Sequence, residues 1–140
     1  MGSGCNGNTA TYYADFWEYD SANNTWTQKA NIGATVNVPA GIPRKSAVAF
    51  AIGTKGYVGT GQNATQLFSD FWEFDPVGNT WTRKNDFGVA TLREGLQRTE
   101  AVGFSIGTKG YVGTGMDETS AYQNDFWSFD PAASADGTWT

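Results

Sequence analysis

The sequence contains no histidine and a single cysteine, Cys5. Without histidine the chain cannot form a Ser-His-Asp or Cys-His catalytic arrangement, and it cannot supply the imidazole ligands of a copper site. One cysteine excludes an internal disulfide and a cysteine-rich metal site. No two carboxylates stand out as a general acid and a general base. We therefore expect no catalytic residue, no metal site and no cofactor in this chain.

Positive charge is scattered along the chain, and long apolar runs are absent. The 14 acidic and 9 basic residues give a formal net charge of -5, and the basic residues do not gather in a run. Such a distribution does not follow a phosphate backbone, so we expect no nucleic-acid partner. No stretch approaches the roughly 18 apolar residues of a membrane span, so we expect no such span.

Proline is also scarce, and helical periodicity is nearly absent. The chain has only 4 prolines but 18 glycines, and aromatic residues make up 15% of it. Aromatic segments between glycine-rich turns are typical of many short strands joined by tight turns. The sequence therefore predicts an all-β fold.

What the sequence does contain is a repeat. An aromatic segment of the form Asp-Phe-Trp-x-Phe/Tyr-Asp occurs at residues 15–20, 70–75 and 125–130, at steps of 55 residues. A second shared segment, Gly-Thr-Lys-Gly-Tyr-Val-Gly-Thr-Gly, occurs at 53–61 and again at 107–115. A period of this length indicates an array of similar supersecondary units.

Each unit is predicted to form four antiparallel strands. In the most complete unit we expect strands over 47–52, 57–59, 70–75 and 80–82, with a glycine turn at 53–56. Four antiparallel strands make one blade of a β-propeller. The predicted architecture is therefore a set of four-stranded antiparallel blades.

The repeat alignment divides the chain into about two and a half blades. We expect a partial first blade at 1–27, a complete blade with its preceding loop at 28–82, and a further blade with a truncated last strand at 83–140. The chain is thus expected to begin and end inside a repeat. Because repeat units bury their faces against their neighbours, we expect 43–82 to be the best-ordered blade and each end to expose an apolar face.

Several motifs resemble those of the kelch repeat. Kelch units carry Pro-Arg before the first strand, a glycine pair closing the second, and Tyr-Asp followed by a spaced tryptophan. The corresponding residues here are Pro43-Arg44, Gly59-Thr60-Gly61 and Phe74-Asp75 with Trp81, and then Arg98, Gly113-Thr114-Gly115 and Phe129-Asp130 with Trp139. The sequence departs from the pattern because a threonine splits the glycine pair and because Ser46 or Glu100 replaces a frequent histidine. The chain is thus similar to a kelch-type β-propeller fragment, as in the central domain of galactose oxidase.

The resemblance implies that the first strand of each blade lines a central channel and that four loops share one face. Those loops are 29–43, 62–69, 84–97 and 116–124, the segments in which the repeats differ most. Variable loops on a repeated scaffold are where recognition usually occurs. We expect a protein or carbohydrate partner on this loop face.

Six residues are candidates for ligand binding. Arg44 and Arg98 precede the innermost strands, where a guanidinium could hold a carboxylate or sulfate, or could instead tie loops together. The aromatic candidates lie outside the strand pattern, and each either contacts a ligand or anchors its loop. They are Tyr13, Phe68, Phe87 and Tyr122. The repeated tryptophans are expected to pack between blades, and the repeated aspartates are expected to support the turns.

These observations favour a non-enzymatic binding scaffold that presents variable loops to its partner. The alternative is a fragment of a secreted carbohydrate-active enzyme, similar to galactose oxidase or to a sialic acid mutarotase, whose catalytic residues lie in missing blades. A third hypothesis gives the blades only a spacer or adhesive role. We also expect the exposed blade faces to bind the remaining blades or a further copy of the chain. The resemblance to repeats of bacterial envelope proteins favours a secreted or cell-surface location.

Overall fold

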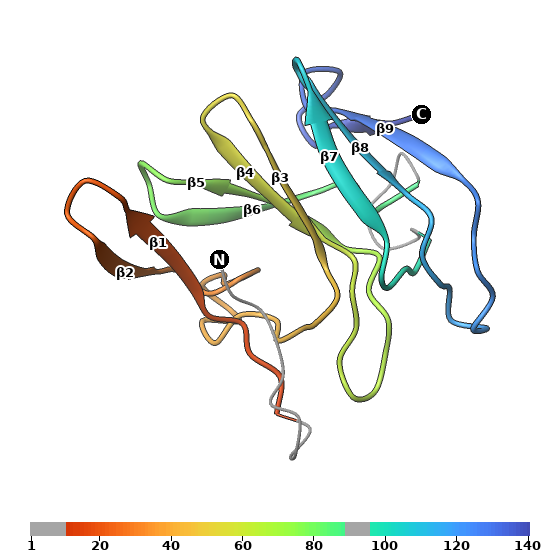
Figure 1. Cartoon of the computed structure of the whole chain (residues 1–140), viewed down its shortest axis with the longest axis horizontal. Helices are drawn as coiled ribbons and strands as arrows, with labels where there is room; N and C mark the ends of the chain where they lie inside the picture. Colours follow the sequence, from red (N-terminus) through yellow and green to blue (C-terminus); the bar gives the residue numbers. More distant parts are fainter. Residues whose placement is uncertain (1–10, 89–95) are drawn as a thin grey trace.

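A computed structural model describes residues 11–88 and 96–140, and these residues form ten short strands and no helix (Figure 1). Across these two ranges, therefore, no helix could cross a membrane. The all-β prediction is confirmed. The strands are β1 Phe16–Asp20, β2 Thr25–Lys29, β3 Val48–Ile52, β4 Lys55–Gly59, β5 Phe71–Asp75, β6 Thr80–Lys84, β7 Val102–Ile106, β8 Lys109–Gly113, β9 Phe126–Asp130 and β10 Thr138–Trp139.

The strands form three antiparallel sheets, each ordered as in the sequence. We call them the first sheet (β1-β2), the central sheet (β3-β4-β5-β6) and the last sheet (β7-β8-β9-β10). Figure 1 shows the three sheets next to one another in sequence order, with β3 and β7 side by side. This arrangement is blade-like, and it confirms the prediction of four antiparallel strands per unit.

The turns follow from particular residues. Gly53 lies in the two-residue turn between β3 and β4 at a φ of 58°, a left-handed conformation that glycine adopts without a steric penalty. In the hairpins that join the third and fourth strands, an aspartate carboxylate accepts the N–H of the residue two positions later. These pairs are Asp20 with Ala22, Asp75 with Val77 and Asp130 with Ala132. The repeated aspartates at these positions therefore support turns.

Neighbouring sheets are joined by a phenylalanine of one sheet that packs against an aromatic pair of the next sheet, and we call this contact the aromatic wedge. Phe16 of the first sheet packs edge-on against Phe74 and Trp81 of the central sheet, at ring-centroid distances of 5.0 and 5.2 Å. Edge-to-face packing is a favoured geometry for buried rings. The wedge recurs one unit later, with Phe71 at 5.1 Å from Phe129 and at 4.9 Å from Trp139. Packing between sheets is thus the role of these tryptophans.

Each wedge tryptophan also makes a hydrogen bond to the preceding sheet. The indole N–H of Trp81 donates to the carbonyl of Ala30 at 2.9 Å, and that of Trp139 donates to the carbonyl of Asn85 at 3.1 Å. Both acceptors immediately follow the outermost strand of the sheet before. Apolar burial alone is not directional, so it does not fix how one sheet is positioned along the next. The repeated hydrogen bond does fix that position.

Closer to β3 and β7, the contact between the central and last sheets depends on glycine. The ring of Phe50 lies where a Cβ atom on Gly110 of β8 would stand. Gly56 occupies the equivalent position in β4, but a Cβ atom there would meet only the Cβ of Phe74, at an ordinary 3.7 Å. Equivalent glycines in the two sheets therefore experience different surroundings.

We predict that Gly110→Ala lowers the free energy of unfolding by about 1–3 kcal/mol, because the new methyl group displaces the Phe50 ring. The matched variant Gly56→Ala should change it by less than about 1 kcal/mol, since the methyl group makes only an ordinary van der Waals contact with the Cβ of Phe74. Urea denaturation of both variants measures the difference. Equal losses would contradict the proposed contact between ring and glycine.

Candidate functional site

A buried arginine connects the start of the central sheet to its third strand. Arg44 precedes β3 and has no exposed surface. Its guanidinium donates to both carboxylate oxygens of Asp70 at 2.7 Å and to the carbonyl of Thr60 at 2.9 Å. The indole N–H of Trp72 donates to the same carboxylate at 2.6 Å. We call this group of four residues the arginine clamp.

The clamp recurs in the last sheet. Arg98 donates to the two oxygens of Asp125 at 2.6 and 2.9 Å and to the carbonyl of Thr114 at 2.7 Å. Trp127 donates to Asp125 at 2.9 Å. The Arg98 guanidinium, with help from the Trp127 N–H, lowers the pKa of the Asp125 carboxyl. Because Arg98 is only 2% exposed, both candidate arginines are engaged by the chain itself.

Each clamp also includes a threonine in an unusual conformation. Thr60 and Thr114 have φ values of 59° and 60°, in the left-handed region that β-branched residues rarely adopt. The N–H of Thr60 donates to the Asp70 carbonyl at 3.1 Å, and its own carbonyl accepts from Arg44. The clamp therefore uses both backbone groups of the threonine that splits the glycine pair.

Two aromatic candidates cover the clamps. The Phe68 ring lies 4.5 Å from the Arg44 guanidinium carbon, and the Phe87 ring lies 5.3 Å from that of Arg98. Both rings are buried, with exposures of 7% and 0%. A guanidinium over an aromatic face is a favourable cation–π contact. The geometry favours loop anchoring for Phe68 and Phe87, and it brings four of the six candidates together in pairs.

The remaining candidates are on the surface. Tyr13 is 43% exposed and Tyr122 is 85% exposed. The Tyr13 carbonyl accepts the N–H of Arg44, so its backbone is fixed while its ring is accessible. Neither ring takes part in the aromatic pairs of the wedge.

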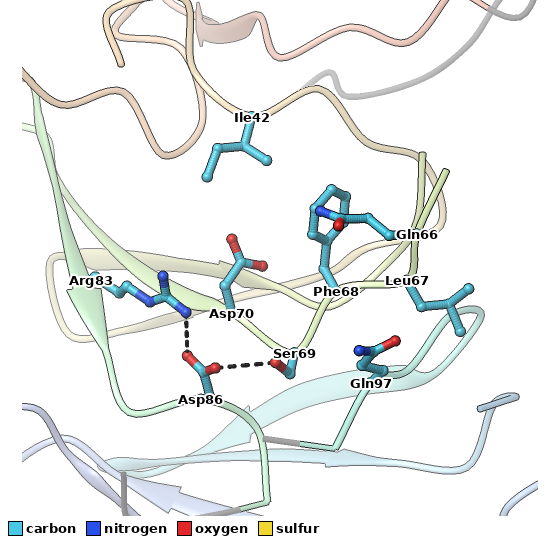
Figure 2. Close-up of a pocket in the computed structure, with 9 residues that line it drawn as sticks. All are labelled: Ile42, Gln66, Leu67, Phe68, Ser69, Asp70, Arg83, Asp86 and Gln97. Atoms are coloured by element: carbon cyan, nitrogen blue, oxygen red, sulfur yellow. Dashed lines mark hydrogen bonds and ion pairs between the residues drawn. The ribbon is translucent and has the colours of Figure 1, made fainter. Parts of the chain in front are cut away.

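A hollow of about 440 Å³ lies beside the first clamp (Figure 2). Residues of three variable loops contribute to it, together with Asp70, which precedes β5, and Arg83 of β6. Its lining residues are Ile42, Gln66, Leu67, Phe68, Ser69, Asp70, Arg83, Asp86 and Gln97. Segments 29–43, 62–69 and 84–97 are thus brought together at one place.

The hollow combines fixed charges with free amides. Arg83 and Asp86 form an ion pair at 2.7 Å, and the Ser69 hydroxyl donates to Asp86 at 3.1 Å. Figure 2 shows this pair on one side and Gln97 on another. The side-chain amides of Gln66 and Gln97 are exposed, and neither makes a hydrogen bond within residues 11–88 and 96–140. Two amides are therefore available to a ligand.

A second hollow of about 210 Å³ adjoins the first, because Gln97 lines both. Loop 116–124 contributes Asp117, Glu118 and Gln123 to it. Hydrogen bonds from the Thr119 hydroxyl and the backbone N–H of Ala121 lower the pKa of Asp117. In the part of the chain that the structure describes, no three His, Cys, Asp or Glu side chains are grouped as metal ligands.

Arg83, Asp86 and the two glutamines were not among the residues predicted from the sequence. One signal could have identified the charged pair: Arg83 and Asp86 replace Gln28 and Asn31 of the preceding repeat. A pair of opposite charges that the preceding unit lacks does not serve an architecture that the two units share. No comparable signal distinguishes Gln66 and Gln97 from other loop residues.

We predict that Arg98→Gln raises the pKa of Asp125 toward the ordinary value of an aspartate, because the cation that lowers it is removed. Trp127→Phe, which removes only the indole donor, should give a smaller rise. Since the folded-state pKa is lowered, the carboxylate stabilises the fold above pH of about 4, and this contribution is lost as the pH falls further. Carboxyl NMR titration measures both variants.

The pKa of Asp117 serves as the internal reference, because its lowering comes from its own loop. It should stay unchanged in both variants. An Asp125 titration that is the same in wild type and both variants would contradict the electrostatic role of the clamp.

A scan against protein-family models finds no match to this chain, and a search of curated proteins likewise finds no similar protein. The functional inference therefore depends on the geometry of the loop face.

Proposed function

We propose that this chain is a non-enzymatic binding scaffold, part of a kelch-type β-propeller, and that its loop face binds a protein or carbohydrate. The observation that carries this proposal is the hollow in Figure 2, where three variable loops bring polar side chains together beside a rigid clamp. Rigid elements that support variable loops are the usual arrangement of binding sites. The kelch assignment is supported by the sequence motifs and the blade-like sheets.

The chemistry of the hollow favours a ligand rich in hydroxyl groups. Gln66 and Gln97 offer two amides, each able to donate and accept hydrogen bonds, as sugar hydroxyls require. Ile42 and Leu67 add apolar surface for the C–H face of a sugar ring. The Phe68 ring is buried against Arg44, so it supports the wall and does not serve as a stacking platform. These features favour a carbohydrate over an extended apolar peptide.

The carboxylates at the hollow support binding over catalysis. Asp70 is held by Arg44, and Asp86 is held by Arg83. A general acid or base needs a carboxyl that can exchange a proton with the substrate, whereas both of these carboxylates are engaged by an arginine of the chain. The alternative, a fragment of a secreted carbohydrate-active enzyme, would use the same hollow as a binding subsite. A secreted or cell-surface location suits both proposals.

The test is a glycan array of neutral and sulfated oligosaccharides, followed by calorimetric titration of the best glycan. Gln97→Ala and Gln66→Ala should each weaken binding about 3- to 10-fold, the effect of losing one or two hydrogen bonds. Gln28→Ala is the matched control, because Gln28 is an exposed glutamine on β2 outside the hollow. Binding that both hollow variants leave unchanged would overturn the proposed site.

A further inference from the structure

The second hollow repeats the first, one unit later in the chain. Each is lined by the residue two positions before a clamp arginine, by the clamp aspartate, and by the residue two positions before that aspartate. These equivalent residues are Ile42 and Leu96, Asp70 and Asp125, and Phe68 and Gln123. In the last pair, each backbone N–H donates to the carbonyl of the equivalent glycine, Gly61 or Gly115, at 2.8 or 2.9 Å. The two hollows therefore occupy equivalent positions beside the central and last sheets.

Gln97 joins the two hollows. It lines both of them, and it lies on the side of the first hollow nearest the last sheet (Figure 2). Its amide is exposed and makes no hydrogen bond within residues 11–88 and 96–140. The first hollow, of about 440 Å³, lies within the range of about 300–1,000 Å³ that is usual for ligand pockets, whereas the second, of about 210 Å³, lies below it. The second hollow is therefore an extension of the first.

Glu118 gives the second hollow a side chain that a ligand can reach. It is exposed, and its carboxylate has no hydrogen bond or ion pair with the residues that the structure describes, 11–88 and 96–140. Asp117 and Gln123 are instead held within their own loop, and their side chains bond to each other at 2.6 Å. An unpaired carboxylate accepts hydrogen bonds from hydroxyl groups. The second hollow thus continues the hydrogen-bonding surface of which Gln97 is part.

The charges along the two hollows favour an uncharged ligand. The two aspartates of the first hollow are each paired with an arginine. In the second hollow Arg98 pairs with Asp125, but Asp117 and Glu118 form no ion pair with a described lysine or arginine. A carboxylate or sulfate on the ligand would therefore meet like charges there. The formal net charge of -5 acts in the same direction.

From these observations we propose that the loop face binds an uncharged linear oligosaccharide, which runs from the first hollow past Gln97 into the second. This inference rests on the proposed carbohydrate binding and specifies the class of ligand. Gln66 and Gln97 bind one part of the sugar chain, and Glu118 accepts hydroxyl groups of the next part. Because neighbouring sheets repeat the hollow, a ligand made of repeated units meets equivalent residues as it passes from one sheet to the next.

The test is calorimetric titration with neutral glucan, mannan and galactan oligosaccharides, each from monosaccharide to hexasaccharide. Oligogalacturonides of the same lengths are the acidic probe. For a neutral series that binds, the affinity should rise about 3- to 10-fold once the sugar chain is long enough to leave the first hollow, because one or two hydrogen bonds are added. Oligogalacturonides should bind more weakly than neutral chains of the same length.

Variants separate the contributions of the two hollows. Glu118→Ala should weaken the binding of long chains about 3- to 10-fold and leave the shortest chain that binds unaffected, whereas Gln66→Ala should weaken both. Glu118→Lys should raise the affinity for oligogalacturonides, because it replaces a like charge with an opposite one. Glu18→Ala and Glu18→Lys are the matched controls, since Glu18 is an exposed carboxylate on β1 outside both hollows.

The outcomes distinguish this inference from the proposed function. If no carbohydrate of any length binds, the proposed function is wrong and this inference with it. If binding depends on Gln66 but not on chain length or on Glu118, the first hollow is the whole site and the path through both hollows is wrong. Tighter binding of oligogalacturonides by the wild type would contradict the preference for uncharged sugars. Circular dichroism should confirm that all variants are folded.

Discussion

The rest of the structure depends on the buried ion pair between Arg44 and Asp70. It fixes the segment before β3 to the start of β5, across the end of β4. Removing one member of a buried pair costs about 3–5 kcal/mol, because the other charge is left without a partner. That is a large share of the 5–15 kcal/mol by which proteins of this size are usually stable. The ends of the loops beside the clamp are therefore held in fixed positions.

The clamp also explains how a strained residue is tolerated. A left-handed threonine costs of order 1–3 kcal/mol and persists only where its surroundings hold it in that conformation. At Thr60 the surroundings do so, because the carbonyl accepts from Arg44 and the N–H donates to the Asp70 backbone. Thr60 lies just before the loop 62–69, so its fixed backbone sets the direction in which that loop leaves the sheet. A repeated scaffold can in this way present different side chains in the same place.

Much of the fold could be predicted because the repeat marks equivalent residues. Asp75 has counterparts in both other units, and the same turn hydrogen bond forms in all three. Trp81 shares its packing role with Trp139. The clamp could be predicted only in part: Arg44 was identified, but its partner lies 26 residues away and no spacing rule connects them. The hollow depends on Gln66, Asp86 and Gln97, which belong to one unit each. The repeat marks Asp86 only as a departure from the preceding unit, and it does not indicate which loop residues meet at the hollow.

The aromatic wedge has a consequence for how such a chain can change in length. Each sheet has a phenylalanine on one side and an aromatic pair on the other. One side of a repeat is therefore complementary to the opposite side of the next repeat. Duplicating a unit would add one wedge and one tryptophan hydrogen bond, and the surfaces at the two ends would stay the same. No single sheet therefore sets the number of sheets in such an array.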